Sequence, residues 1–386
     1  MNNKTKKKYC IFAAQYFPHL GGVERYTYNL AKKLIEDGNE VVIVTSNVYK
    51  LAECEKVDGI RVYRIPCWNW LEGRYPVLKM NSKFWKINRI LKKKKFDMVI
   101  VNTRFYPHSL YGMMFAKRIK AKCITLDHGT SHLSIHNRFW DFLGAVFEHG
   151  LTKIDQIFCK DYYGVSGACN EWLSHFHIKA KGVLYNSIDL DEVNNIQKKM
   201  DISYRDDYNI PKDATVVAFT GRLLKEKGLP SLLNVMDKIN KERDDVYLFI
   251  AGDGDMQEEV NSRGNSHIIP VGRIDFEHIV ALLSESDIFC LPSFSEGFST
   301  SILEAVACGC YILTTARGGA KELLINDEYG CVILNNQEKL LYDALTEVIN
   351  HPDKRKKGIE LTYQRIKDNF TWDIVANNVE KICEEK

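Results

Sequence analysis

Short apolar runs and amphipathic helical segments alternate along almost the whole chain. Residues 9–14 (YCIFAA) are followed by apolar residues at helical spacing from Val23 to Leu34, and then by Gly38 and a second apolar run at residues 40–45. A strand that is buried on both faces is a continuous apolar run, and a helix connecting two such strands makes them parallel. The pattern therefore predicts an α/β protein with helices on both faces of parallel sheets.

The alternation occurs twice, with a charged stretch between the two series. The first includes IRVYRI, DMVIVN, KCITL and GVLYN, and residues 190–214 then predict a linker with a short helix. The second includes TVVAFTG, VYLFIAG, HIIPVG, DIFCLP, CYILTT and GCVIL. We therefore predict two Rossmann-like domains, residues 1–188 and 189–370, with ligands outside the carboxyl ends of the strands.

The composition excludes several classes of protein. The 386 residues are 45% hydrophobic and 27% charged, and their net charge of +3 gives no reason to expect nucleic-acid binding. The eleven cysteines form no CxxC pair, and many lie in apolar runs, which indicates reduced thiols in a cytoplasmic protein. No apolar run approaches the roughly 20 residues that span a bilayer.

Two glutamates lie in different settings within residues 293–305 (SFSEGFSTSILEA). Glu296 follows the strand DIFCLP in a loop, whereas Glu304 lies on the buried helix that begins near residue 300. Backbone N–H groups before such a helix favour an anion; here they belong to Gly297, Phe298 and Ser299. A carboxylate accepts two sugar or ribose hydroxyls, but a capping Glu296 and a salt-bridged Glu304 are equally open on these residues alone.

A charged loop follows the first strand of the second series. In residues 221–228 (GRLLKEKG), Gly221 ends the strand, and Arg222 and Lys227 can converge on one anion. Arginine offers the bidentate fork that suits phosphate, so the pair favours a diphosphate. The alternative is an ordinary solvated loop.

Two polar loops follow strands of the first series. The glycine pair that includes Gly22, within residues 18–25, allows a ligand to approach the backbone. It is not G-x-G-x-x-G, which disfavours a dinucleotide. Residues 127–132 (DHGTSH) place His128 at a strand end, and three histidines spaced by four suggest a metal face: His128, His132 and His136. Because Gly129 indicates a loop and no acidic or cysteine partner completes the set, we expect no metal site.

Five motifs occur in a fixed order: GGVER, LYNSID, GRLLKEKG, EGFSTSILEA and ARGGAKELL. Together they resemble family 4 of the retaining glycosyltransferases over essentially the whole chain. That family has the GT-B fold, in which two Rossmann-like domains face each other across a cleft. The resemblance further implies that residues 371–386 form a C-terminal helix that crosses back to the N-terminal domain. Ser187, Ser299 and Tyr311 depart from common family residues, which leaves the particular sugar open.

The resemblance implies a nucleotide-sugar donor, with UDP preferred to GDP, and no further cofactor. Arg222 and Lys227 would hold the diphosphate, Glu304 the ribose and Glu296 the sugar. The other implied donor contacts are Gly22 and His128 in the N-terminal domain, and Gly221, Arg273, Ile274, Gly297, Phe298 and Ser299 in the C-terminal domain. Because the two cations would stabilise the leaving diphosphate, we expect retaining transfer without a metal.

The acceptor side is indicated by residues 79–95, which contain eight basic residues and no acidic one. Four apolar residues recur there at helical spacing: Met80, Phe84, Ile87 and Leu91. A basic amphipathic helix indicates peripheral binding to an anionic membrane surface, and relatives that glycosylate lipid-linked acceptors favour this prediction. The alternative is a packed helix whose apolar face belongs to the core.

We therefore expect a cytoplasmic, peripheral-membrane transferase that builds a bacterial-type surface polysaccharide on a glycan or lipid-linked acceptor. One alternative is a sugar-nucleotide epimerase of the same fold, which forms product from the donor alone. A second is a catalytically silent nucleotide-sugar-binding subunit, disfavoured by the two glutamates and two cations. A third is a nicotinamide dehydrogenase, disfavoured by the glycine pattern. The oligomeric state is left open.

Overall fold

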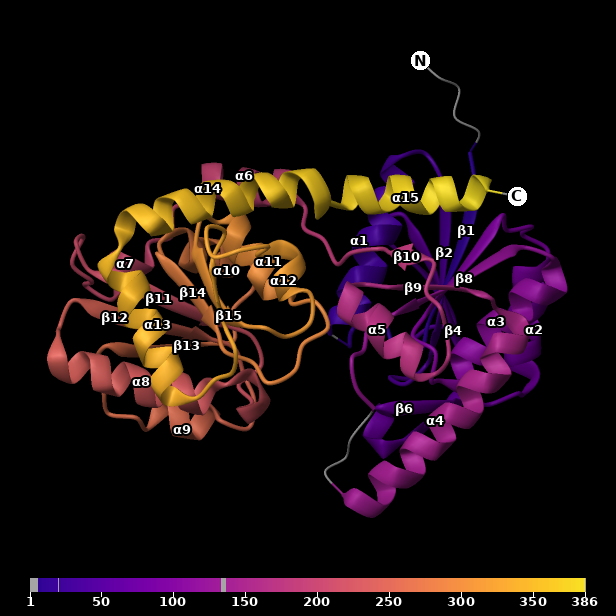
Figure 1. Cartoon of the computed structure of the whole chain (residues 1–386). Coiled ribbons are helices and arrows are strands. Elements are labelled where there is room, and N and C mark those ends of the chain that lie inside the picture. The colour runs from indigo at the N-terminus through magenta and orange to yellow at the C-terminus, as the bar shows by residue number, and fades with distance from the viewer. Residues whose placement is uncertain (1–5, 20, 133–136, 386) are drawn as a thin grey trace. The chain divides into compact units, whose positions relative to one another are not determined.

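The chain forms two compact α/β units in the computed structural model, which describes residues 6–19, 21–132 and 137–385 (Figure 1). Unit 1 comprises Met1–Asn186 and Trp372–Lys386, and unit 2 comprises Ser187–Thr371. The predicted α/β class, with parallel sheets in two domains, is confirmed.

The sheet of unit 1 has the strand order β10-β9-β8-β7-β1-β2-β4-β3 among the described residues. Neighbouring strands are parallel except β3, which pairs antiparallel with β4. The strands are β1 (Lys8–Ala13), β2 (Glu40–Ser46), β3 (Cys54–Val57), β4 (Ile60–Ile65), β7 (Met98–Asn102), β8 (Lys122–Asp127), β9 (Asp161–Gly164) and β10 (Gly182–Val183). A separate antiparallel hairpin, absent from our prediction, consists of β5 (Cys67–Trp70) and β6 (Tyr75–Leu78).

Helices cover both faces of this sheet: α1 (Gly22–Glu36), α2 (Ser82–Lys92), α3 (Pro107–Ile119), α4 (Arg138–Phe158), α5 (Gly167–His175) and α15 (Trp372–Glu384). The helix α1 has the predicted apolar face, and Gly38 follows its end at φ +90° as a left-handed residue. The C-terminal helix α15 lies against α1 (Figure 1). Trp372 meets the Tyr26 ring at 5.0 Å between centroids, and Asp373 pairs with Lys33 at 2.6 Å.

The sheet of unit 2 is parallel, with the order β13-β12-β11-β14-β15-β16 in the described part of the chain. Its strands are β11 (Thr215–Thr220), β12 (Val246–Ala251), β13 (Ile268–Gly272), β14 (Ile288–Leu291), β15 (Tyr311–Thr315) and β16 (Cys331–Ile333). This is the doubly wound order 3-2-1-4-5-6, in which the direction of winding reverses between β11 and β14. Each of these strands falls on an apolar run that the sequence singled out.

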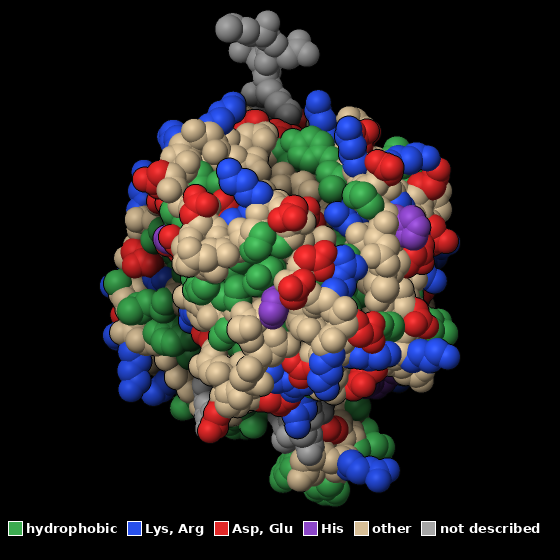
Figure 2. All heavy atoms as spheres, turned by 90° about the vertical axis from the view of Figure 1, so that its left-hand side faces the viewer, with side chains coloured by type: hydrophobic (Ala, Val, Ile, Leu, Met, Phe, Trp, Pro, Cys, Tyr) green, Lys and Arg blue, Asp and Glu red, His purple; other side chains and the backbone are tan. Residues whose placement is uncertain are grey.

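The helices of unit 2 are α6 (Leu190–Lys199), α7 (Tyr204–Asp207), α8 (Leu229–Glu242), α9 (Gln257–Asn261), α10 (Phe276–Ser284), α11 (Thr300–Ala307), α12 (Ala320–Leu323), α13 (Glu338–Asn350) and α14 (Pro352–Asn369). The polar stretch that predicted a linker contains α6 and α7. On the face shown in Figure 2, acidic and basic side chains are interspersed rather than gathered by sign.

Candidate functional site

The two charged motifs of the C-terminal half lie at the switch point of the unit 2 sheet. Strands β11 and β14 are direct neighbours, although they are far apart in sequence. The loop 221–228 follows β11, and the loop 292–299 follows β14. Because parallel strands end at the same edge, both loops emerge side by side where open α/β sheets bind ligands.

Backbone contacts hold these two loops together. The Phe294 amide donates to the Glu226 carbonyl at 2.8 Å. Gly228 has φ +75°, and a Cβ on it would lie 2.0 Å from the Pro292 carbonyl oxygen. Glycine is therefore required at this turn for two reasons: its left-handed backbone and the close approach of Pro292, the residue directly after β14.

We predict that Gly228→Ala lowers the free energy of unfolding of unit 2 by about 2 kcal/mol or more, since strain and overpacking add. Gly309→Ala is the matched control, because Gly309 has φ +90° but a Cβ there would meet nothing within 4 Å. Gly309→Ala should lower the free energy of unfolding by only about 1 kcal/mol. Urea unfolding followed by circular dichroism measures both, and equal losses would contradict the role of the Pro292 contact.

The side chains of Lys227 and Glu296 meet across these loops. Lys227 Nζ donates to Glu296 Oε1 at 2.5 Å, and Ser293 Oγ donates to the same oxygen at 2.8 Å. Both members of the pair are largely shielded, with side-chain exposures of 21% and 13%. Arg222 is exposed, and among the described residues no carboxylate pairs with its guanidinium.

The loop before α11 packs against the ARGGAKELL motif and against Phe370, which directly follows α14. The Gly319 amide donates to the Gly297 carbonyl at 2.9 Å, and the Phe298 ring lies 5.3 Å from that of Phe370. Ser299 is the N-cap of α11, but its side chain makes no capping hydrogen bond. Glu304 is 8% exposed on the same helix. The predicted backbone anion site at Gly297–Ser299 thus directly precedes α11, the helix that carries Glu304.

Arg273 and Ile274 lie after β13, two strands away from β11. Arg273 Nη1 donates to Asp253 Oδ2 at 3.3 Å, and both side chains are exposed. The Asp253 carbonyl in turn accepts from the Leu223 amide at 2.7 Å. Asp253 therefore links Arg273 to the loop after Gly221, a connection that our sequence reasoning missed although the AGDGD segment follows a strand.

His128 lies at the end of β8 in unit 1, within a hydrogen-bond chain that fixes its tautomer. Thr27 Oγ1 donates to the Val23 carbonyl at 2.7 Å, so Asn102 Nδ2 donates to Thr27 and Asn102 Oδ1 faces His128 Nε2 at 3.1 Å. Nε2 therefore carries the proton, and Nδ1 is an acceptor. Burial lowers the His128 pKa to about 3, so the ring is neutral at physiological pH.

The two glycines at the start of α1, Gly21 at the N-cap and Gly22 as the first helical residue, differ in their surroundings. A Cβ at Gly21 would lie 2.5 Å from Glu24 Oε2, whereas a Cβ at Gly22 would meet nothing within 4 Å. Glu24 is buried and lies 3.1 Å from His19 Nδ1. A side chain at Gly21 would therefore displace the Glu24 carboxylate. Gly22 borders open space on α1, the helix that also carries Tyr26, whose ring meets His128 at 5.0 Å.

A buried ionic network that the sequence did not reveal lies behind His128. Arg104, only 1% exposed, donates to Asp127 and, through Nη2, to Glu148 Oε1 at 2.5 Å. Glu148 Oε2 lies 2.7 Å from His132 Nδ1. Burial raises the Asp127 pKa, and the Arg104 cation opposes that rise. The network fixes the end of β8. Asp127 and His132 belong to the DHGTSH segment, but Arg104 and Glu148 come from segments far away in the sequence, which no local pattern connects to it.

The three histidines spaced by four do not form a helical face where the structure describes them. The His128 ring hydrogen-bonds to Asn102, whereas the His132 ring hydrogen-bonds to Glu148, so the two rings have different partners. His136 lies outside the described residues.

The expectation that the apolar face of residues 79–95 meets lipid needs correction. Phe84, Ile87 and Leu91 of α2 are buried in the core of unit 1. Lys83 pairs with Glu53 at 2.9 Å. This apolar face therefore belongs to an ordinary packed helix. The spacing could not show this, because the apolar residues of a core helix and of a membrane-surface helix recur at the same interval.

Family models match both halves of the chain. The model for Glycosyltransferase Family 4 matches residues 20–192, and that for Glycosyl transferases group 1 matches residues 201–365. An uncharacterized glycosyltransferase of Methanocaldococcus jannaschii is 28% identical over 98% of each chain. The phosphatidylinositol N-acetylglucosaminyltransferase GPI3 subunit of Saccharomyces cerevisiae is 28% identical over 95% of this chain and 80% of its own.

A solved structure of similar fold is that of Anabaena HepE in complex with UDP. Its TM-score is 0.73 at 16% identity, over 98% of this chain and 99% of that chain. The two family models occur in the order of the two units, and the fold agrees with them. The chain therefore belongs to glycosyltransferase family 4 and has the GT-B fold.

Proposed function

We propose that this chain transfers a sugar from a nucleotide-sugar, bound by unit 2, to a glycan or lipid-linked acceptor. The observation that carries the proposal is the pairing of Lys227 with Glu296 where β11 and β14 end side by side. This is the edge at which doubly wound sheets bind nucleotides. HepE was solved with UDP, which supports UDP as the nucleotide.

The charges in the loops suit the departure of a diphosphate. When the bond between the anomeric carbon and the phosphate oxygen breaks, its electron pair stays on that oxygen. Lys227 and the exposed Arg222 would stabilise the resulting charge, which is commonly the largest catalytic contribution. The acceptor hydroxyl would attack the same face of the sugar and lose its proton to the departing phosphate, so the configuration is retained. No Mg²⁺ or Mn²⁺ is then required.

The remaining donor contacts in unit 2 are those that the family resemblance implies. Glu304 would accept the ribose hydroxyls and Glu296 those of the sugar, while Arg273 and Ile274 would flank the base. The backbone at Gly221 and at Gly297–Ser299 would approach the phosphates. The assignment of Gly22 and His128 to the donor, and that of the pathway and cellular compartment, stay predictions of the resemblance.

Release of UDP tests the proposal. We expect UDP-glucose or UDP-N-acetylglucosamine to yield UDP only when an acceptor such as phosphatidylinositol or a polyprenyl phosphate is present. Proton NMR of the product should show the anomeric configuration of the donor, and added Mg²⁺ or Mn²⁺ should not raise the rate. Conversion of the donor alone into an epimer would instead establish the epimerase alternative. Release of no nucleotide with any donor would contradict the proposal.

The helix α4 supplies a surface for the lipid part of such an acceptor. Its inward side is polar or charged at Glu148, Thr152 and Asp155, whereas its outward side is apolar. The exposed apolar residues in its first half are Phe139, Trp140, Phe142, Leu143, Val146 and Phe147. In Figure 1 this half projects beyond the strands of unit 1. The described part of the chain contains no helix with both the length and the hydropathy to cross a bilayer.

The β5–β6 hairpin extends this surface. The Tyr75 ring lies 6.2 Å from that of Phe147, and Trp68 and Trp70 of the hairpin are exposed. Lys79, directly after the hairpin, lies 6.0 Å from the Trp68 ring centroid. We infer that aromatic side chains of α4 and the hairpin enter an anionic membrane surface, while the basic residues within 79–95 add electrostatic attraction.

We predict that Phe139→Ser with Phe142→Ser weakens binding to anionic phosphatidylglycerol vesicles at least tenfold, because each buried aromatic contributes about 1.5–3 kcal/mol. Leu334→Ser with Ile325→Ser, two exposed apolar residues of unit 2, is the matched control and should leave binding unchanged. Replacing Lys92–Lys95 by glutamine should remove the part of vesicle binding that is sensitive to salt. Vesicle sedimentation measures all three, and salt-independent binding that survives the α4 change would contradict the inference.

A further inference from the structure

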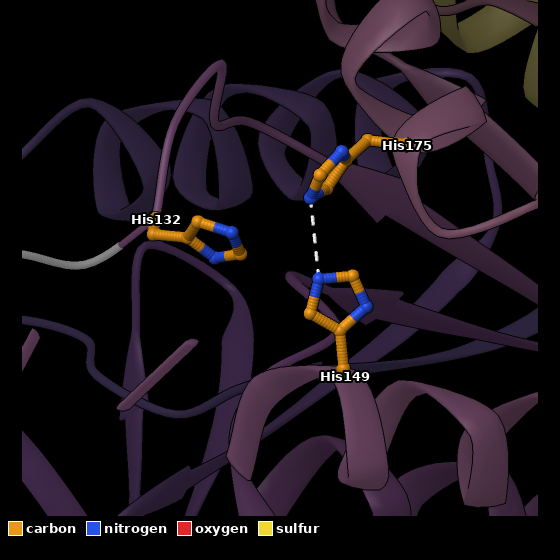
Figure 3. Close-up of side chains that lie close together, drawn as sticks. All are labelled: His132, His149 and His175. Carbon is orange, nitrogen blue, oxygen red and sulfur yellow. Dashed lines mark hydrogen bonds between the residues drawn. The ribbon is translucent and has the colours of Figure 1, made fainter. Parts of the chain in front are cut away.

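Three histidines from three separate elements of unit 1 converge on one point. His132 lies in the loop after β8, His149 lies on α4, and His175 is the last residue of α5. Figure 3 shows their rings turned toward one another around a common centre. One ring nitrogen from each lies within 4.8 Å of those of the other two. The fold therefore gathers three imidazoles that the sequence separates.

The spacing of two of these nitrogens fits a shared metal ion. His149 Nε2 and His175 Nε2 are 3.2 Å apart (Figure 3). Two ligands of a tetrahedral zinc ion, with bonds of 2.0–2.1 Å, lie about 3.3 Å apart. Without a metal, one of the two nitrogens must carry a proton for the pair to attract, and the other must accept it.

The third imidazole, that of His132, is oriented as a metal ligand commonly is. His132 Nδ1 lies 2.7 Å from Glu148 Oε2, so the carboxylate holds the proton on Nδ1 and leaves a lone pair on Nε2. The His175 ring is also held, because Trp172 stacks on it at 4.8 Å with an angle of 8° between the planes. Glu148 and Trp172 thus orient two of the three rings. Because the three ring nitrogens lie only within 4.8 Å of one another, His132 would have to approach the other two to share one ion with bonds of 2.0–2.1 Å.

The charges behind the cluster favour a cation. Glu148 and Asp127 both bond to Arg104, and this group of three is buried. The two carboxylates and the one guanidinium carry a net charge of −1 next to the three imidazoles. Glu148 would attract a divalent ion bound between the imidazoles, because it contacts His132.

We propose that His132, His149 and His175 bind one divalent transition-metal ion, preferentially Zn²⁺. Three imidazole nitrogens suit Zn²⁺ and its neighbours in the first transition row, not Mg²⁺ or Ca²⁺, which prefer oxygen. The fourth position is left for water or another ligand. The ion ties the loop after β8 to α4 and α5, and this loop begins at the strand end that carries His128. The site is independent of the diphosphate-binding loops of unit 2.

Titration of the chelator-treated full chain with Co²⁺, followed by competition with Zn²⁺, tests the proposal. We expect one Co²⁺ per chain, the intense visible absorption of a tetrahedral nitrogen-ligated ion, and its loss on addition of one equivalent of Zn²⁺. His149→Gln and His175→Gln should each weaken binding by at least about a hundredfold, more than loss of an outer-shell partner does. Added Mg²⁺ should not compete.

His177→Asn is the matched control, because His177 lies two residues beyond the cluster, is exposed, and has a left-handed backbone that asparagine tolerates. It should bind Co²⁺ as the unmodified chain does. Tryptophan fluorescence during urea unfolding, without metal, checks that each variant is folded. Absence of stoichiometric binding, or equal binding by folded His149→Gln and His175→Gln chains, would overturn the proposal.

Discussion

Lys227→Ala should lower kcat at least about a hundredfold, because it removes a fixed cation from the oxygen on which charge develops as the sugar–phosphate bond breaks. Lys227 lies in the short turn before α8, where Glu296 and the Gly228 turn fix its position. Lys225→Ala is the matched control. Lys225 is exposed in the same turn and should change kcat less than about twofold. Steady-state UDP release with a saturating donor measures both.

The two glutamates separate binding from turnover in the same assay. Glu296→Ala should mainly lower kcat, because it frees Lys227 Nζ from its carboxylate and removes the proposed contact with the donor sugar. Glu304→Ala should mainly weaken donor binding, since its carboxylate lies on α11 behind the loop. Small changes in kcat and donor binding for both glutamate variants, together with equal kcat values for Lys225→Ala and Lys227→Ala, would contradict a catalytic role. The loops would then have only a structural role.

The largest effect on stability is expected from Arg104→Met. It leaves the buried Asp127 and Glu148 carboxylates without their shared cation, and breaking a buried pair in this way costs about 3–5 kcal/mol. All six tryptophans of the chain lie in unit 1, so their fluorescence in urea reports unfolding of that unit alone.

The control for Arg104→Met is Lys357→Met. Lys357 pairs with Glu328 at 2.6 Å, but the two side chains are 62% and 58% exposed, so the change should cost less than about 1 kcal/mol. Because Lys357 lies in unit 2, its effect is followed by circular dichroism. A loss below about 1 kcal/mol for Arg104→Met would contradict the view that this network holds the end of β8.

Most strands were predictable because they are buried on both faces of the sheets, which makes each of them a continuous apolar run. The strands β3 (Cys54–Val57) and β9 (Asp161–Gly164) were missed because neither is such a run. The β5–β6 hairpin was not predictable, since its exposed Trp68 and Trp70 break that pattern.

The helix α2 was predicted as a helix, but its apolar face was assigned to lipid, whereas Phe84, Ile87 and Leu91 pack in the core of unit 1. Attraction of its basic residues to a membrane stays a prediction. Spacing shows that a face is apolar and does not show whether protein or lipid covers it.

The candidate donor loops were predictable because each follows a strand and carries its charges within a few residues. The Lys227–Glu296 pair required the strand order, which places β14 beside β11. The histidine cluster was missed for a related reason. Spacing by four directed attention to His136, whereas the actual companions of His132 are His149 and His175, on two helices later in the chain. Long-range pairing of this kind leaves no local pattern.

The most direct test of the central claim, that unit 2 binds a nucleotide-sugar through these loops, is thermal unfolding with a panel of ligands. A ligand at a hundred times its Kd stabilises the folded chain by about 2.7 kcal/mol. We predict that a UDP-sugar raises the Tm of the unmodified chain, and that Glu304→Ala loses most of this rise relative to its own Tm without ligand. A rise with NAD and with no nucleotide-sugar would contradict the account.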